Sequence, residues 1–292
     1  MNEKKAGSVI LLKKRMLLAI YAVFLTLLAG AAATFAWYVY NTERYTTNVK
    51  MAAGAGTSIQ ISNSYDGTYG SSTVLKEFVG TLNPVSTDSI RGGFQKVFGF
   101  TNGSENQPTL VASLFGKAIS SDYYKTTLFV RTNGDTADIY LSDIGFQDSD
   151  KNNPISTAIR VGLVVYEPGR AGNVKDEFIF EINKGSNPQG VYNTATGQDG
   201  YVLDSKKTDG TTRAFTPLSS ANFCNYDTNT GVTTLKPDSR KLFTLKGKNG
   251  GYGDSVQVDV YIWLEGCDKD CTNNLCSTTL KNAALSFAAY RK

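Results

Sequence analysis

The clearest pattern in this chain is the segment VQVDVYIWLE, residues 256–265, in which apolar and other side chains alternate without a break. Successive side chains of a β-strand point to opposite faces, so every second residue falls on the same side. One face would carry Val256, Val258, Val260, Ile262 and Leu264, and the other Gln257, Asp259, Tyr261, Trp263 and Glu265. This strict alternation predicts a half-buried strand.

The same alternation recurs along the chain. Residues 158–167, AIRVGLVVYE, place Ile159, Val161, Leu163 and Val165 on one face, and residues 176–183, DEFIFEIN, do the same with Phe178, Phe180 and Ile182. Clusters of Gly, Asn, Asp and Ser separate these runs, and no strand–helix–strand rhythm is visible. Many strands joined by turns predict an all-β fold, specifically an antiparallel β-sandwich of jelly-roll type with inserted loops.

Composition divides the chain into three parts. Residues 57–292 form the expected sandwich domain, and a Gly-, Asn-, Asp- and Thr-rich stretch around residues 185–212 is interpreted as an insertion into it. Residues 37–56 are expected to be an extended N-terminal arm. Residues 1–36 are expected to be a signal peptide or a membrane anchor in the form of an N-terminal helix.

The first forty residues begin with a basic segment followed by an apolar run. Five basic residues precede position 16 against the single acid Glu3, which is typical of a cytoplasm-facing end. No charged residue occurs from Met16 to Tyr40. At a rise of about 1.5 Å per residue, such a helix could cross a hydrocarbon core of about 30 Å. A transmembrane anchor is therefore one interpretation.

The composition of this run favours a cleaved signal peptide instead. Its strongly apolar part ends at Leu28 and small residues follow, as in signal peptides. Signal peptidases need small side chains three positions and one position before the cleaved bond. Two positions in this segment meet that requirement, and we favour cleavage between Ala36 and Trp37. In either case the body of the chain is expected outside the cytoplasm, exported by the Sec route, with signal peptidase as a partner and with the leader as its contact with the membrane.

The charge balance argues against a nucleic-acid partner. The chain has 30 Lys and Arg and 26 Asp and Glu, and the first 36 residues hold five of the basic and one of the acidic residues. Subtracting them leaves 25 of each, so the basic character belongs to the leader. No basic stripe remains that would bind a phosphate backbone.

The absence of histidine is the main constraint on catalysis. It excludes HExxH zinc proteases and every triad that uses a histidine base. The chain also contains no S-x-x-K, G-x-S-x-G, phosphate-loop or dinucleotide-binding motif. A glycosidase needs only two carboxylates, but nothing in the sequence singles out a pair. We expect a protein that is not an enzyme and has no cofactor.

The chain has four cysteines, three of them in the ten-residue segment CDKDCTNNLC. Their spacing does not match the paired C-x-x-C knuckles of a zinc ribbon, and an exported location favours disulfides. Two disulfides are the favoured interpretation; one disulfide, unpaired thiols and a metal site are the alternatives. If there are two bridges, one of them must link a cysteine of CDKDCTNNLC to Cys224. The sequence does not decide which cysteine that is. The candidates are Cys224, Cys267, Cys271 and Cys276.

Two acidic turns place oxygen ligands at alternate positions, as calcium loops do. They contribute the weak calcium candidates Asp148, Asp150, Asp268 and Asp270. An EF-hand would need glycine where Asn153 and Asn273 stand. Solvated turns, in which Asp and Asn side chains satisfy backbone donors, are therefore the favoured interpretation, and no metal site is expected.

The segment after the leader opens with the aromatic group WYVY and continues as a polar, extended chain. In an uncleaved protein these aromatics would form an interfacial belt. In a cleaved protein they would begin an extended arm, which is typical of a strand donated to the open sheet edge of a neighbour. The donor-strand candidates are Trp37, Tyr38, Val39, Tyr40, Tyr45 and Val49.

The order GAAATFAWYVYNTERYTTNVKMAAGAGTSIQIS resembles the exported TasA/camelysin family of Gram-positive biofilm-matrix fibre proteins. In that family a dedicated ER-type signal peptidase processes the leader. The resemblance covers residues 16–62, and VYIWLEGCDKDC near the C-terminus is similar to a strand and loop of the same family. The cysteine cluster and the stretch around residues 185–212 depart from the family's pattern.

The resemblance implies a jelly-roll subunit that builds extracellular fibres by passing its N-terminal arm into the next subunit. Its partners would be copies of itself or related matrix subunits. Some members have been described as metalloproteases, and without histidine that activity is not carried over. The alternative is a membrane-anchored surface adhesin or binding module, which requires that Met16 to Tyr40 persist as a membrane helix.

Overall fold

The computed structural model divides the chain into two units, Met1–Arg44 and Tyr45–Lys292. In the first unit the described positions, 16, 17, 19, 21 and 23, are helical. No helix formed by described residues is long and apolar enough to cross a membrane. The ranges described in the second unit are 48–52, 58–75, 82–97, 115–146, 154–170, 172–182, 189–193, 198–203, 217–268, 270–271, 275 and 283–291.

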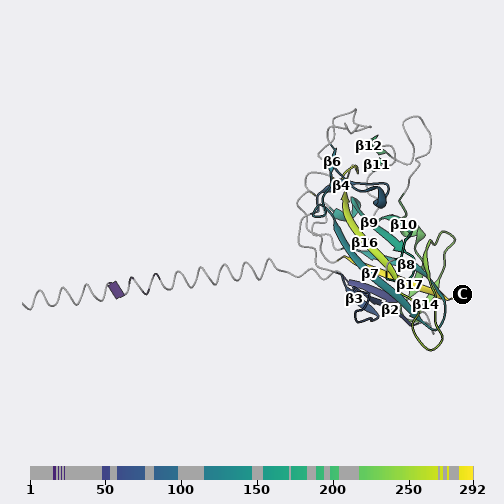
Figure 1. Ribbon diagram of the computed structural model, residues 1–292. Helices are drawn as coiled ribbons and strands as arrows, with labels where there is room; N and C mark the ends of the chain where they lie inside the picture. The colour runs from purple at the N-terminus through teal and green to yellow at the C-terminus, as the bar shows by residue number, and fades with distance from the viewer. Residues whose placement is uncertain are drawn as a thin grey trace, which may run out of the picture. The chain divides into compact units, whose positions relative to one another are not determined.

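The second unit consists mainly of two β-sheets (Figure 1). The first, sheet A, has the strand order β15-β8-β17-β1-β3. Its strands are β1 (Asn48–Ala52), β3 (Ser72–Val74), β8 (Ala137–Gly145), β15 (Lys241–Leu245) and β17 (Ala284–Arg291). All pairs are antiparallel except β1 and β17, which run parallel. The first described strand of the second unit therefore lies beside the last.

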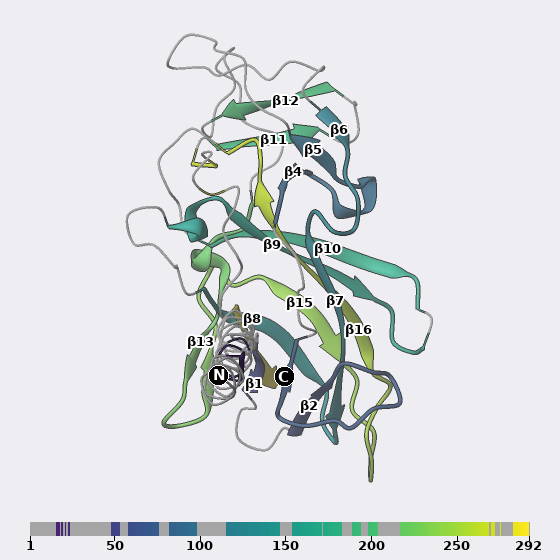
Figure 2. The ribbon, with the colours of Figure 1, turned by 90° about the vertical axis from the view of Figure 1, so that its left-hand side faces the viewer.

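The second sheet, sheet B, is built around β16 (Val256–Glu265), which pairs with β9 (Ile159–Tyr166) and β7 (Tyr124–Asn133) (Figure 2). Next to these lie β10 (Val174–Glu181) and β2 (Ser58–Ser62). The last residues of β16 pair in parallel with β4 (Pro84–Ser86). From there the sheet continues through β5 (Gln95–Val97) and β6 (Phe115–Lys117).

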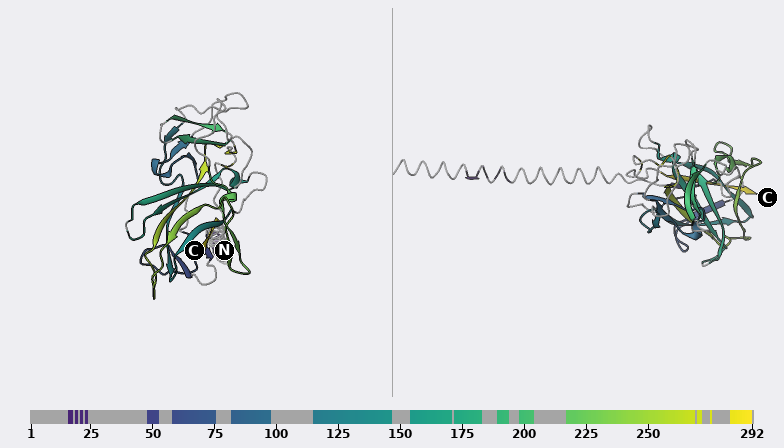
Figure 3. Two further views of the ribbon diagram at one scale, coloured as in Figure 1. Left: turned by 90° about the vertical axis from the view of Figure 1, so that its right-hand side faces the viewer. Right: turned by 90° about the horizontal axis from the view of Figure 1, so that it is seen from above.

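Short helices and two hairpins lie outside the two main sheets. Figure 3 gives two further views of the ribbon. The short helices are of the 3-10 type: η1 (Ile90–Gly92), η3 (Ile155–Thr157) and η4 (Ser220–Asn222). Two hairpins form two-stranded sheets of their own: β11 (Gln189–Asn193) with β12 (Gln198–Leu203), and β13 (Asn225–Asp227) with β14 (Val232–Thr234). The first hairpin falls inside the stretch that the sequence marks as an insertion.

The main hydrophobic core lies between the two sheets. Sheet A contributes Ile139, Leu141, Leu285 and Phe287, and sheet B contributes Val161, Leu163, Phe178, Phe180, Val256, Val258, Val260, Ile262 and Leu264. The apolar faces that the alternating segments predict are thus the faces that meet. The all-β, two-sheet prediction is confirmed. The two parallel pairings, β1–β17 and β16–β4, depart from the wholly antiparallel arrangement that the sequence predicts.

Part of the outer face of sheet B, around the C-terminal end of β16, is also buried. A second cluster contains Val85, Ile90, Phe94, Val164, Ile179 and Trp263. Gly162 in β9 lets this layer approach, because a Cβ atom there would lie 2.4 Å from Cδ1 of Ile90 and 2.9 Å from Cζ3 of Trp263. The prediction that β16 is half-buried is therefore wrong at its C-terminal end, where the segment carrying η1 covers the second face.

Candidate functional site

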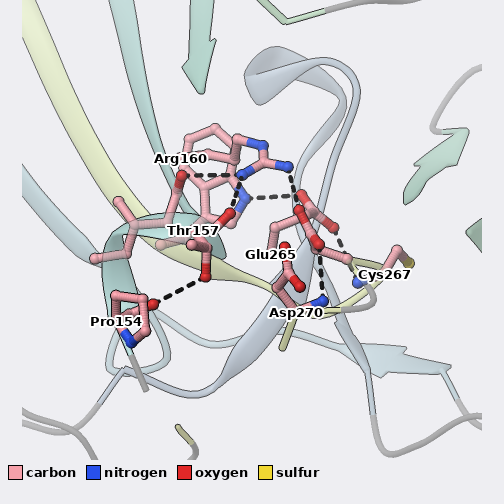
Figure 4. A network of polar contacts seen from close by, with 9 residues as sticks. Pro154, Thr157, Arg160, Glu265, Cys267 and Asp270 are labelled. Carbon is pink, nitrogen blue, oxygen red and sulfur yellow. Dashed lines mark hydrogen bonds and ion pairs between the residues drawn. The ribbon is translucent and has the colours of Figure 1, made fainter. Parts of the chain in front are cut away.

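Charged side chains are buried at the C-terminal end of β16 (Figure 4). Arg160 in β9 stands opposite Trp263 in β16 on one side and opposite Glu181 in β10 on the other. Directly opposed residues in paired strands point to the same face, so all three lie on the outer face of sheet B. Arg160 is only 2% exposed, which requires partners for its guanidinium.

Arg160 finds these partners in the loop after β16 and in its own strand. Its Nη2 donates to Oδ2 of Asp268 at 2.5 Å, and Asp268 is fully buried. Its Nη1 donates to the carbonyl oxygen of Ile159 at 3.0 Å and, at 3.4 Å, to that of Thr157 in η3. One buried guanidinium thus joins β9, η3 and the loop that follows β16.

Glu265 is the second buried acid of this network. Its Oε2 accepts a hydrogen bond from Nε1 of Trp263 at 3.0 Å, and its Oε1 accepts one from the backbone N–H of Cys267 at 3.2 Å. Burial raises the pKa of Glu265 to about 7, although Arg160 and the hydrogen bonds from Ser86, Trp263 and Cys267 act to lower it. Burial also raises the pKa of Asp268.

Protein groups donate to both acids. Asp268 accepts from Arg160 at one carboxylate oxygen and from the N–H of Asp270 at the other. Both oxygens of Glu265 also accept bonds, so all four oxygens of the two acids are occupied by protein donors. Two other buried carboxylate oxygens, Oε2 of Glu181 and Oδ2 of Asp270, have no hydrogen-bond partner among the described residues.

The calcium candidates divide between described and undescribed residues. Asp268 forms an ion pair with Arg160. Asp270 caps the same turn through its backbone N–H. Asp148 and Asp150 lie outside the described residues. Within the described ranges, no group of three or more acidic or cysteine side chains is placed to hold a metal ion.

The cysteines lie in separate environments. Cys224 is buried with Tyr140 and Ala288, whereas Cys271 belongs to the core between the sheets. Burial raises the pKa of the Cys224 thiol to about 11. No disulfide joins any two of Cys224, Cys267 and Cys271, and Cys276 lies outside the described residues. The predicted bridge from the Cys267–Cys276 segment to Cys224 is therefore not formed by the cysteines that the structure describes.

The predicted donor strand is described only at its end. Val49 lies in β1, opposite Leu285 of β17 and Thr73 of β3 in the same subunit. Asn48–Ala52 thus belong to the subunit's own sheet in this structure. Ala36, Trp37, Tyr38, Val39, Tyr40 and Tyr45, which include both sides of the predicted cleavage site, lie outside the described residues.

Two of the sheet edges carry local contacts that occupy some of their backbone groups. In β10, the side chain of Asp176 accepts from the N–H of Glu177, and the backbone of Leu218 bonds to Ile179 and Glu181. In β3, Nδ2 of Asn63 donates to the carbonyl oxygen of Val74. Charges, short strands and side-chain caps of this kind prevent edge-to-edge pairing.

The edge formed by β15 is different. Among the described strands, Lys241–Leu245 pairs with β8 alone. Asp138 of β8 accepts a hydrogen bond from the side chain of Thr244 and forms an ion pair with Lys241 at 3.8 Å. These contacts fix β15 on its inner side, and its outer side is available to a further strand in the part of the chain that the structure describes.

The buried network was missed by the sequence analysis, although a signal for it exists. Arg160 is the only charged residue in the run AIRVGLVV, and Glu265 ends the strand at residues 256–265, on the same face as Trp263. A charge inside an apolar strand needs a buried partner. The partner itself, Asp268, could not be chosen among the acids without the pairing of β9 with β16.

Comparisons of the chain with protein-family models, with curated proteins and with solved structures found no match.

Proposed function

We propose that this protein is an exported structural subunit of an extracellular fibre or biofilm matrix. Its N-terminal arm, residues 37–47, would add as a strand to the sheet of a neighbouring subunit. The observation that carries the proposal is the outer edge of β15, which among the described strands pairs with β8 alone, while the edges of β10 and β3 carry local contacts. In this proposal the two-sheet body is the jelly-roll-type sandwich that the family resemblance implies.

An open edge strand is a template for main-chain hydrogen bonds, which do not depend on the sequence of the incoming strand. The arm supplies aromatic and Thr residues, which have high β propensity, and it joins the folded body directly at β1. In sheet A, β17 and β8 lie between β1 and β15. The strand that follows the arm in the sequence and the edge strand that would accept a neighbour's arm are therefore separated within one sheet, which supports head-to-tail growth between subunits.

The first experiment compares a chain that begins at Trp37 with a chain that begins at Asn48. We expect the longer chain to form fibres under the electron microscope and the shorter chain to remain monomeric in size-exclusion chromatography. A synthetic peptide of residues 37–47 should bind the shorter chain and should block growth when added to the longer one. Fibres of equal yield from both chains would exclude the arm as the connector.

The second experiment locates the acceptor edge. Lys241 in β15 has a side chain that is 47% exposed, so its amine can react with a crosslinker that also reacts with the α-amine of Trp37. Fibres grown from a mixture of isotopically light and heavy chains should yield mixed light–heavy crosslinks between these two amines. Crosslinks to other lysines would reject β15 as the acceptor. An intact Met16–Tyr40 segment found only in the cell envelope would favour the anchored adhesin instead.

A further inference from the structure

Three side chains far apart in the sequence meet at one carboxylate oxygen beside β4 and β5. Asn83 directly precedes β4, Lys96 lies in β5, and Asp122 lies between β6 and β7. Oδ1 of Asp122 accepts from Nδ2 of Asn83 at 2.7 Å and from Nζ of Lys96 at 3.0 Å. The amine and the amide nitrogen are thus both held against the same oxygen atom.

The protein holds this carboxylate firmly. Oδ2 of Asp122 accepts from the N–H of Ile119 at 2.9 Å, and the carbonyl oxygen of Asp122 accepts from the N–H of Asn83 at 3.0 Å. The side chain of Asp122 is only 2% exposed, and that of Lys96 is 30% exposed. Burial acts to raise the pKa of Asp122, but hydrogen bonds from Ile119, Lys96 and Asn83 outweigh it and lower the pKa, so the carboxylate is ionised beside the Lys96 amine.

Several residues close to the three polar groups in the sequence are apolar and buried. Leu82 and Val85, on either side of Asn83 in the sequence, are fully buried. The rings of Phe94 and Tyr123, close in sequence to Lys96 and Asp122, stack with their centroids 4.3 Å apart. Burial of Asp122 strengthens its contacts with the two nitrogen atoms, because the local dielectric is low there.

From this geometry we infer that Lys96 and Asn83 become joined by an intramolecular isopeptide bond, with Asp122 transferring the protons. The inference concerns a covalent modification and does not depend on the proposed assembly function. The bond would link the start of β4 to β5, two short strands that extend sheet B beyond β7. Short strands with few ladder bonds gain most from such a link.

The reaction needs no reagent from outside the protein. Asp122 accepts a proton from the Lys96 ammonium, and the neutral Nζ attacks Cγ of Asn83. The new C–Nζ bond forms and the C–Nδ2 bond breaks, while Asp122 delivers its proton to the departing Nδ2. The nitrogen leaves as ammonia, which takes up the second proton from Nζ and departs as ammonium. Charge and electrons balance, and Asp122 returns to its carboxylate form.

A second lysine–amide–aspartate group in the same sheet gives a natural comparison. Asp259 accepts from Nε2 of Gln257 at Oδ1 and contacts Nζ of Lys125 at Oδ2, 3.0 and 3.1 Å away. The amine and the amide therefore bind different oxygens. Although burial alone would lower the pKa of Lys125, hydrogen bonds with Tyr261 and Asp259 raise it, which keeps the amine protonated. No bond is expected there.

Mass spectrometry tests the inference directly on the mature chain recovered from producing cells. We expect an intact mass lower than the calculated mass by one ammonia molecule. Trypsin should yield a branched peptide in which residues 77–91 are joined to residues 92–117, because a modified Lys96 is not cleaved. An intact mass equal to the calculated mass, together with the separate linear peptides 77–91 and 92–96, would overturn the inference.

Three variants distinguish this bond from other losses of ammonia. Lys96→Arg keeps the positive charge beside Asp122 but removes the nucleophile, so the full mass should return. A succinimide at Asn249–Gly250 would also lose ammonia, but it would persist in this variant. Lys125→Arg is the matched control and should leave the ammonia loss intact. Asp122→Asn should slow or abolish the reaction. Persistence of the reduced mass in Lys96→Arg would contradict the inference.

Discussion

Arg160 and Asp268 lie 108 positions apart in the sequence and form a buried ion pair of 2.5 Å between β9 and the loop after β16. Replacing Asp268 with alanine would leave the guanidinium buried without its main partner. Breaking a buried pair in this way typically costs about 3–5 kcal/mol of unfolding free energy. We expect Asp268→Ala to fall at the lower end of this range, because Glu265 still acts on Arg160, and urea denaturation would measure the loss.

The matched control for this variant is Asp66→Ala. Asp66 pairs with Arg170 on the surface, where both side chains are more than half exposed. Exposed pairs contribute about 0–1 kcal/mol. Equal losses of stability in the two variants would show that burial of the Arg160–Asp268 pair carries no special weight.

Glu265 should make the protein less stable as the pH rises through the weakly acidic range. Its pKa is about 7 in the folded protein against an ordinary 4.5. Between these values the folded state holds a proton that the unfolded state has released, so unfolding free energy falls as the pH rises. The contribution is complete below pH 4.5 and is lost above pH 7. The raised pKa of Asp268 acts in the same direction.

Urea denaturation of the wild-type protein and of Glu265→Gln, each across the interval from pH 4.5 to 7, would check this. The slope of stability against pH should be smaller in the variant, because glutamine does not titrate. Glutamine also has only one acceptor oxygen for the donors Trp263 and Cys267, so the absolute stability of the variant is not the readout. An unchanged slope would exclude Glu265 as the titrating group.

Gly162→Ala should destabilise the protein by overpacking. The added Cβ would lie 2.4 Å from Cδ1 of Ile90, well inside contact distance. Forcing an additional methyl group into a packed core costs about 1–3 kcal/mol. Adding Ile90→Val removes that Cδ1 atom and should recover part of the loss. Gly251→Ala is the control, since nothing lies within 4 Å of its Cβ position, and thermal unfolding would rank the four proteins.

Cys224 should resist alkylation in the folded protein. Burial both excludes the reagent and raises the pKa of the thiol to about 11, which leaves very little thiolate at neutral pH. In denaturant the same thiol should react at an ordinary rate. Peptide mapping after alkylation without reduction would report the modification, and a peptide linking Cys224 to another cysteine would contradict the arrangement described here.

The sequence predicted the strands of the main core well, because alternation is a local signal. Val258, Leu163 and Phe180 all lie on the faces that meet between the sheets, as their spacing requires. The sequence failed where burial comes from distant segments. The alternation predicts an outward-facing side for Trp263 and Glu265, but both are buried, and Trp263 packs in the cluster that contains Ile90 of η1.

The candidate sites show the same limit. That Arg160 needs a partner is visible in its own strand, but its pairing with Asp268 follows only from the position of β9 beside β16. Asn83, Lys96 and Asp122 each look like ordinary turn or strand residues in the sequence. Their meeting depends on how β4, β5 and the turn before β7 are arranged, and no periodicity encodes that arrangement.

The parallel pairing of β1 with β17 has a consequence for the order of folding. Each of the five residues of β1 finds its partner among residues 284–288, at the far end of the chain. Sheet A therefore cannot reach its final strand order until nearly the whole polypeptide has been synthesised, and closing so long a loop is slow. Until then the N-terminal segment stays without its permanent neighbour, so a chaperone or a second chain has its widest opportunity to bind it during this interval.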